Sequence, residues 1–217
     1  MFTFAAGRPL SGRPFDPELW QTVGSELARM HGAMDAFSSA NSRYHLDLTM
    51  LVDMPLAEIR PYVTAAEEKA YAELTELAQG LKAAVSNGTW DPGTYGLIHA
   101  DTHDGNIHVA PDGSFTLFDF DHCGYGWRAY DLMPYYRPPT AENEKEIQKS
   151  EAFLGGYDAI RGITATERDL FPVFRACRAL WDIGDWLRAA AWTGNAWALD
   201  GICDRALTRV REPLGGD

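Results

Sequence analysis

Residues 98–107 read IHADTHDGNI, and FDFD follows at residues 118–121. Only a predicted β-hairpin, two short strands around a Pro-Asp-Gly turn, separates these polar stretches. Asp101 and Asn106 therefore lie on the loop that enters the hairpin, and Asp119 lies where the chain leaves it. Because a hairpin brings its two ends together, we expect these three side chains to form one polar site.

The three side chains suit phosphoryl transfer. That reaction needs an acceptor for the proton of the attacking hydroxyl, and oxygen ligands that hold magnesium against the phosphates. One Asp as base, with an Asn and an Asp as ligands, meets this demand because Mg²⁺ takes few, hard oxygen donors from a protein. The spacing His99-x-Asp101-x4-Asn106, followed by Asp119-Phe120, is the arrangement of kinase motifs.

With these motifs the chain resembles the aminoglycoside phosphotransferase and choline kinase superfamily, in its homoserine-kinase-like or hydroxylysine-kinase-like branch. The Asp-Gly-Asn at 104–106 fits this group better than the protein kinases, as do Gly-Tyr-Gly at 124–126 and Tyr-Asp-Leu at 130–132. The resemblance implies an α+β, mainly helical fold, like the C-terminal lobe of the protein-kinase-like fold with a small β-hairpin layer. It also implies a phosphotransferase that uses ATP and Mg²⁺ and acts on a hydroxyl of a small molecule.

The resemblance also implies roles for single residues. Asp101 would be the catalytic base that orients the acceptor hydroxyl. Asn106 and Asp119 would hold magnesium and, through it, the nucleotide. Asp121 would be a second metal contact or an anchor for the turn.

Two further residues would be structural according to the same resemblance. His99 would brace residues 99–106, which we call the catalytic loop because the resemblance places the catalytic base on it. Asp131 would bind backbone groups near that loop rather than touch substrate.

Other interpretations fit parts of the cluster. Either polar stretch alone is ordinary turn chemistry, since Asn and Asp favour turns. A two-metal hydrolase is the other catalytic alternative. Such enzymes usually need further histidine-rich motifs, and the chain has no histidine after His122. The hydrolase would use six side chains: Asp101, His103, Asp104, Asn106, Asp119 and His122.

Helices are predicted on both sides of the polar cluster. Asp16-Pro17 is a helix start, and a second long helix is expected to begin around Thr64 and to stop at Asn87-Gly88. Its residues Glu67, Glu68 and Glu73 are expected to face solvent. Helical patterns return after about residue 141. The apolar stripe of the first helix consists of Trp20, Val23, Leu27, Met30, Met34 and Phe37.

The part of a kinase that grips the nucleotide is not found in the sequence. A Gly-rich loop and a strand Lys are expected there, but the first lysine is Lys69, in the second predicted helix. Residues 1–15 resemble the hinge after the N-terminal lobe, and residues 16–217 resemble the C-terminal catalytic lobe. We therefore leave activity open. The alternatives are a separate partner that supplies the missing lobe, self-association, a remnant kinase, and a non-catalytic binding or regulatory module.

The resemblance also implies that the acceptor pocket is built largely by the C-terminal helices. Trp181 and Asp185 share a face of the last long predicted helix, as do Asp182 and Trp186. Aromatic rings beside carboxylates suit an amine, which predicts an amino alcohol or amino sugar as acceptor. The alternative is that the tryptophans pack in the core and the acids face water.

Composition and charge limit which partners and which cellular compartment fit the chain. The formal net charge of −12 argues against nucleic acid as a partner. The three cysteines have no metal-binding spacing, which favours reduced thiols. No secretory leader and no apolar run of the roughly 18–20 residues that span a bilayer is seen. We therefore expect a cytoplasmic protein that does not bind membranes.

Overall fold

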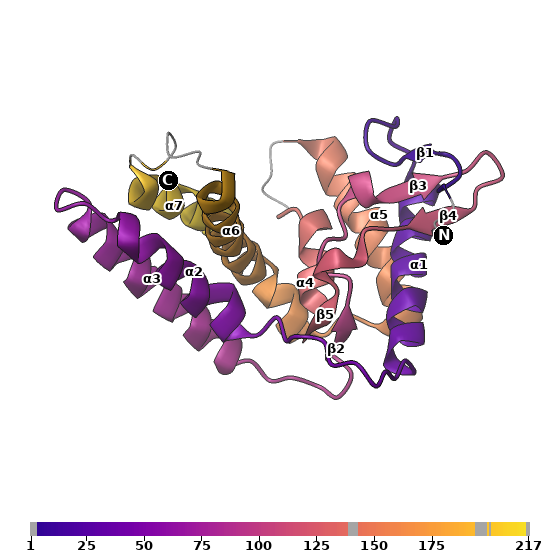
Figure 1. Cartoon of the computed structure of the whole chain (residues 1–217). Helices are drawn as coiled ribbons and strands as arrows, with labels where there is room; N and C mark the ends of the chain where they lie inside the picture. The colour runs from indigo at the N-terminus through magenta and orange to yellow at the C-terminus, as the bar shows by residue number, and fades with distance from the viewer. Residues whose placement is uncertain (1–3, 139–142, 194–198, 200, 216–217) are drawn as a thin grey trace. The chain divides into compact units, whose positions relative to one another are not determined.

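The computed structural model describes residues 4–138, 143–193, 199 and 201–215. The chain forms two units (Figure 1). The first runs from the N-terminal residues to Tyr44 and resumes over Asp91–Arg168, and the second comprises His45–Trp90 and the residues from Asp169 onward. Both motif stretches belong to the first unit.

Helix α1, Pro17–Asp35, begins as its sequence predicts. The Asp16 carboxylate accepts hydrogen bonds from the amides of Glu18 and Leu19, at 3.1 and 3.3 Å. The first part of the expected apolar stripe is buried, but Phe37 lies beyond the end of the helix and is 58% exposed. The stripe therefore extends less far than the spacing predicted.

Helices α1 and α5, Glu144–Arg161, lie side by side in the first unit (Figure 1). Their contact depends on two glycines. A Cβ at Gly24 would overlap the carbonyl oxygen of Phe153, and a Cβ at Gly156 would overlap that of Gln21. The two backbones therefore approach more closely than any other residue would allow.

The strands form two small antiparallel sheets. The predicted hairpin is confirmed as β3, Ile107–Val109, and β4, Phe115–Leu117. A short strand β1, Arg8–Pro9, joins its edge. The second sheet pairs β2, Tyr95–Ile98, with β5, Gly124–Trp127. The second pairing brings the start of the catalytic loop next to the chain that follows the second motif.

Helix α4, Arg128–Leu132, follows β5 directly and is mostly buried. It carries the Tyr-Asp-Leu stretch under the catalytic loop. Single 3-10 turns at Asp104–Asn106 and Phe120–His122 shape the two motif loops, and a third follows α4 at Met133–Tyr135.

The second unit is helical. Helix α6 begins in the last residues of the first unit. The described elements are a π-helical turn Thr49–Asp53, α2 Met54–Ile59, a 3-10 turn Arg60–Tyr62, α3 Glu68–Ser86, α6 Ala165–Thr193, α7 Ile202–Arg211 and a 3-10 turn Glu212–Leu214.

One expected surface residue of this unit is buried. The Glu67 carboxylate accepts hydrogen bonds from the Thr64 hydroxyl at 2.8 Å and from the Cys203 amide at 3.3 Å. The prediction of a solvated face was therefore wrong for Glu67. These hydrogen bonds hold the pKa of Glu67 below its usual value.

The mainly helical α+β class is confirmed, and the small sheets carry the motif loops. Among the described residues, no helix combines the length and the apolar character that a membrane span requires.

Candidate active site

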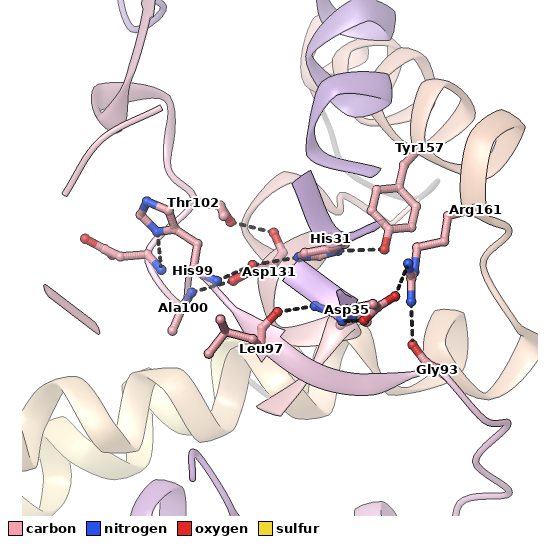
Figure 2. A network of polar contacts seen from close by, with 12 residues as sticks. His31, Asp35, Gly93, Leu97, His99, Ala100, Thr102, Asp131, Tyr157 and Arg161 are labelled. Atoms are coloured by element: carbon pink, nitrogen blue, oxygen red, sulfur yellow. Dashed lines mark hydrogen bonds and ion pairs between the residues drawn. The ribbon is translucent and has the colours of Figure 1, made fainter. Parts of the chain in front are cut away.

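The catalytic loop begins at a left-handed residue that a buried carboxylate holds in place. Ala100 has a φ of 68°. The amides of His99 and Ala100 donate to the two carboxylate oxygens of Asp131, at 2.8 and 2.7 Å. The Thr102 hydroxyl donates to the Asp131 carbonyl at 2.6 Å (Figure 2). Helix α4 therefore fixes the backbone on both sides of Asp101.

Asp131 is itself held by a histidine, and a tyrosine holds that histidine in turn (Figure 2). His31 donates from Nε2 to the Asp131 carboxylate at 2.9 Å, and its Nδ1 accepts from the Tyr157 hydroxyl at 2.7 Å. Burial lowers the pKa of His31, although Asp131 acts in the opposite direction. Burial also raises the pKa of Tyr157, so its hydroxyl stays protonated and donates. The ring of His31 is therefore neutral, with its proton on Nε2.

A second polar chain supports the strand that leads into the loop. Arg128 is buried and bonds the Leu97 carbonyl and the Asp35 carboxylate. Asp35 also pairs with Arg161 at 2.7 Å, and Arg161 donates to the Gly93 carbonyl at 2.9 Å (Figure 2). Gly93, just before β2, and Leu97 within β2 are therefore tied to helices α1, α4 and α5.

His99 joins the two motif loops. Its Nε2 donates to the Phe118 carbonyl at 2.9 Å, and its Nδ1 accepts from the Asp101 amide at 3.2 Å. Its ring packs on Phe120 with a centroid distance of 4.3 Å. The Phe118 amide also donates to the Asn106 carbonyl at 3.1 Å. Backbone contacts therefore hold the end of the hairpin against the catalytic loop.

Asp101 and Asn106 are in direct contact. Asn106 Nδ2 donates to the Asp101 carbonyl at 3.0 Å and to its carboxylate at 3.1 Å. The Asp101 side chain keeps 15% of its surface exposed, and His103 Nε2 lies 3.6 Å from the carboxylate. Because both contacts of Asn106 use its nitrogen, the amide oxygen is the atom that suits a metal ion.

Asp119 adopts a left-handed conformation, with a φ of 66°, and is exposed. Asp121 is exposed as well, and its carbonyl accepts from Arg43 at 3.2 Å. One amide oxygen and one exposed carboxylate are hard ligands that fit Mg²⁺, which keeps several waters. Among the described residues, no three His, Cys, Asp or Glu side chains form a group that could hold a metal ion.

The four residues proposed for the acceptor lie on α6 in the second unit. Trp181 is buried and Trp186 is 37% exposed. Asp182 pairs with Arg178 at 2.6 Å, and Asp185 pairs with Arg188 at 3.1 Å. The same helix therefore already supplies a cation to each carboxylate.

Sequence patterns did not single out His31, Tyr157 or Arg43. A signal existed for His31, because it lies one helical turn after Leu27 on an apolar face. A polar residue at such a position needs a buried partner. Tyr157 and Arg43 gave no comparable signal.

A family model described as "Phosphotransferase enzyme family" matches residues 1–168. An uncharacterised protein of Deinococcus radiodurans is 36% identical over 197 residues, which cover 85% of this chain and 53% of that protein. A homoserine kinase of Bradyrhizobium diazoefficiens is 28% identical, covering 95% of this chain and 64% of the kinase. The chain therefore spans about half to two thirds of the length of these relatives.

A solved structure has a similar fold. The amicoumacin kinase hAmiN, in complex with AMP-PNP, Ca²⁺ and Ami, superposes with a TM-score of 0.68 at 22% identity. The match covers 96% of this chain and 62% of the kinase chain.

Proposed function

Because the chain belongs to the phosphotransferase enzyme family, we propose that it provides the catalytic loop and the metal ligands of a small-molecule kinase. The kinase would transfer a phosphoryl group from ATP to a hydroxyl group. Family membership confirms the resemblance that the two motifs indicated.

The observation that carries this proposal is the connection between the two motif loops. His99 and Phe118 join them, and Asp131 holds the backbone before Asp101. Phosphoryl transfer depends on positioning and charge stabilisation rather than on covalent help from the protein. A fixed loop with a partly exposed carboxylate supports the assignment of Asp101 as the group that accepts the proton of the acceptor hydroxyl.

Asn106 and Asp119 would hold Mg²⁺, with Asp121 as a second contact. The metal would neutralise charge on the phosphates. The assignment of Asn106 is supported by its buried side-chain amide, whose nitrogen is fixed by two hydrogen bonds to Asp101. The assignment of Asp119 is supported by its exposed position and left-handed backbone conformation.

The acceptor is proposed to be an amino alcohol or amino sugar that meets Trp181, Asp182, Asp185 and Trp186. The Bradyrhizobium relative is named for homoserine, an amino acid that carries both an amine and a hydroxyl. Arg178 and Arg188 now neutralise the two carboxylates, so an amine would have to displace a guanidinium. Unchanged affinity of Asp185→Ala for every amine tested would remove this part of the proposal.

The groups that cover and grip the nucleotide are proposed to lie outside these 217 residues. Either a longer chain or a separate partner would supply them. The length of the relatives supports this view, since the chain covers 53% of the Deinococcus protein.

A transfer assay tests the function. The full-length protein, meaning this chain together with the segment or partner that supplies the nucleotide-binding groups, is incubated with Mg²⁺, γ-labelled ATP and a panel of hydroxyl acceptors that includes homoserine and amicoumacin. We expect one acceptor to be labelled and Asp101→Asn to lower kcat at least a hundredfold, consistent with the 10²–10⁴-fold of general base catalysis. Equal rates in Asp101→Asn and wild type would remove Asp101 from its role.

A further inference from the structure

The loop that carries Asp119 has little regular structure of its own. Asp119 is a non-glycine residue in the left-handed region, a strained conformation that persists only when the surroundings enforce it. A single 3-10 turn, Phe120–His122, follows, and it is closed by the Cys123 amide and the Phe120 carbonyl at 3.0 Å. Contacts from elsewhere in the chain must therefore hold this loop.

Arg43, from the segment after α1, supplies such contacts. Its Nε donates to the Cys123 carbonyl at 2.7 Å. Its Nη2 donates to the Asp121 carbonyl at 3.2 Å and lies 3.4 Å from the Phe120 carbonyl. One planar guanidinium therefore reaches two carbonyls of the turn and the carbonyl of the residue after it, a geometry that the point charge of lysine does not reproduce.

The neighbouring residue strengthens this attachment. The Tyr44 carbonyl accepts from the Tyr125 amide at 3.0 Å, and the Arg43 guanidinium lies 5.4 Å from the centroid of the Tyr44 ring. Residues 43–44 are therefore bound to both ends of the segment 120–125. The guanidinium also places a positive charge beside a loop that carries two exposed carboxylates, Asp119 and Asp121.

We propose that Arg43 is a positioning residue for the metal site. It would fix the loop so that the Asp119 carboxylate is in place before Mg²⁺ and nucleotide arrive, without touching either ligand. This inference rests on the proposed function, because it takes Asp119 as a metal ligand. It adds a residue that lies more than seventy positions before the motif and belongs to neither motif stretch.

The test is the magnesium dependence of nucleotide binding in the full-length protein. AMP-PNP binding is titrated with Mg²⁺ for wild type, Arg43→Gln, Arg43→Lys and a control, Arg29→Gln. Arg29 lies on α1 in the same unit and pairs with Glu26 on the same helix, so its substitution removes one exposed cation from α1 and not from the segment that bonds the loop. Supporting residues around metal ligands typically change metal affinity 10–100-fold.

We expect Arg43→Gln to raise the Mg²⁺ concentration for half-saturation at least tenfold, with metal-free AMP-PNP binding unchanged. Arg29→Gln should match wild type. Arg43→Lys keeps the charge without the planar fork and should still show a clear increase, which keeps the inference testable if Arg43→Gln does not fold.

Two results would overturn the inference, and the second would also overturn the proposed function. Arg43 variants that stay within twofold of wild type would overturn it alone. A wild-type protein without any magnesium-dependent AMP-PNP binding would remove the proposed function together with it.

Discussion

Tyr157→Phe tests the network that holds the catalytic loop. The substitution removes one oxygen atom and leaves the ring, which contacts His31 edge-on at a centroid distance of 5.6 Å. Because only one atom is removed, the loss of stability comes mainly from the lost hydrogen bond to His31 Nδ1 and not from a cavity. His31 is fully buried, and no water is expected to replace the hydroxyl.

A buried acceptor left without its donor costs about 1–3 kcal/mol. We therefore expect Tyr157→Phe to lower the free energy of unfolding by about 2 kcal/mol, or roughly thirtyfold in the folding equilibrium constant. Urea unfolding followed by tryptophan fluorescence measures this difference.

Tyr95→Phe is the matched control. Its hydroxyl also bonds a protein acceptor, the Tyr125 carbonyl, but at 3.3 Å and on the surface. Loss of an exposed bond should change stability by no more than about 0.5 kcal/mol. If the two variants are equally stable within that margin, the buried tyrosine and histidine do not hold Asp131 in the way proposed.

Three further predictions concern the packing and ionisation of single residues. Gly156→Ala should lower the free energy of unfolding by about 1–3 kcal/mol, because the added Cβ overlaps the backbone of α1. Gly155→Ala, whose Cβ would have no atom within 4 Å, should raise it by about 0.5–1 kcal/mol. Urea unfolding of both variants measures the two changes, and changes of the same sign would refute the packing argument. Because the pKa of His31 is lowered in the native state, the unfolded state binds a proton below about pH 6.5 that the native state does not bind. The free energy of unfolding should therefore fall as the pH drops, by up to about 1.4 kcal/mol per pH unit. His31→Asn should lose this pH dependence in unfolding experiments between about pH 7.5 and 5.5. Burial raises the pKa of Cys177 to about 12, so at pH 8 its thiolate should be roughly a thousandfold less populated than that of a free thiol. A disulfide reagent should therefore label Cys177 no faster than the protein unfolds, and faster labelling of this residue would contradict the structure.

The hairpin and the first helix were predictable because their signals are local. The turn between β3 and β4 carries Gly113 at a φ of 83°, and α1 has a side-chain cap from Asp16. Strand β5 was missed because its sequence, Gly-Tyr-Gly-Trp, contains two residues that disfavour strands. Its pairing with β2 is a tertiary contact, and no local pattern reports it.

The site was predictable as a set of residues but not as a supporting network. The spacing around Asp101 and Asn106 marked the loop, while the residues that hold it come from distant helices. His31 is 100 residues away from Asp131 in the sequence, and Tyr157 is 126 residues away from His31. Glu67 shows the same limit, because its partner Cys203 is 136 residues away.

Whether Asp119 binds magnesium, and through it the nucleotide, decides whether the proposed function is correct. The thermal stability of the full-length protein is measured with ATP alone and with ATP plus Mg²⁺, in wild type, Asp119→Ala and Asp112→Ala. Asp112 lies in the turn of the same hairpin, where its carboxylate accepts from Ser114 at 2.7 Å, so it controls for the loss of an acid. A ligand at 100 times its Kd stabilises the native state by about 2.7 kcal/mol. We predict a magnesium-dependent increase of that size in wild type and Asp112→Ala and none in Asp119→Ala. No magnesium-dependent increase in wild type, or an equal one in Asp119→Ala, would contradict the proposed role of Asp119.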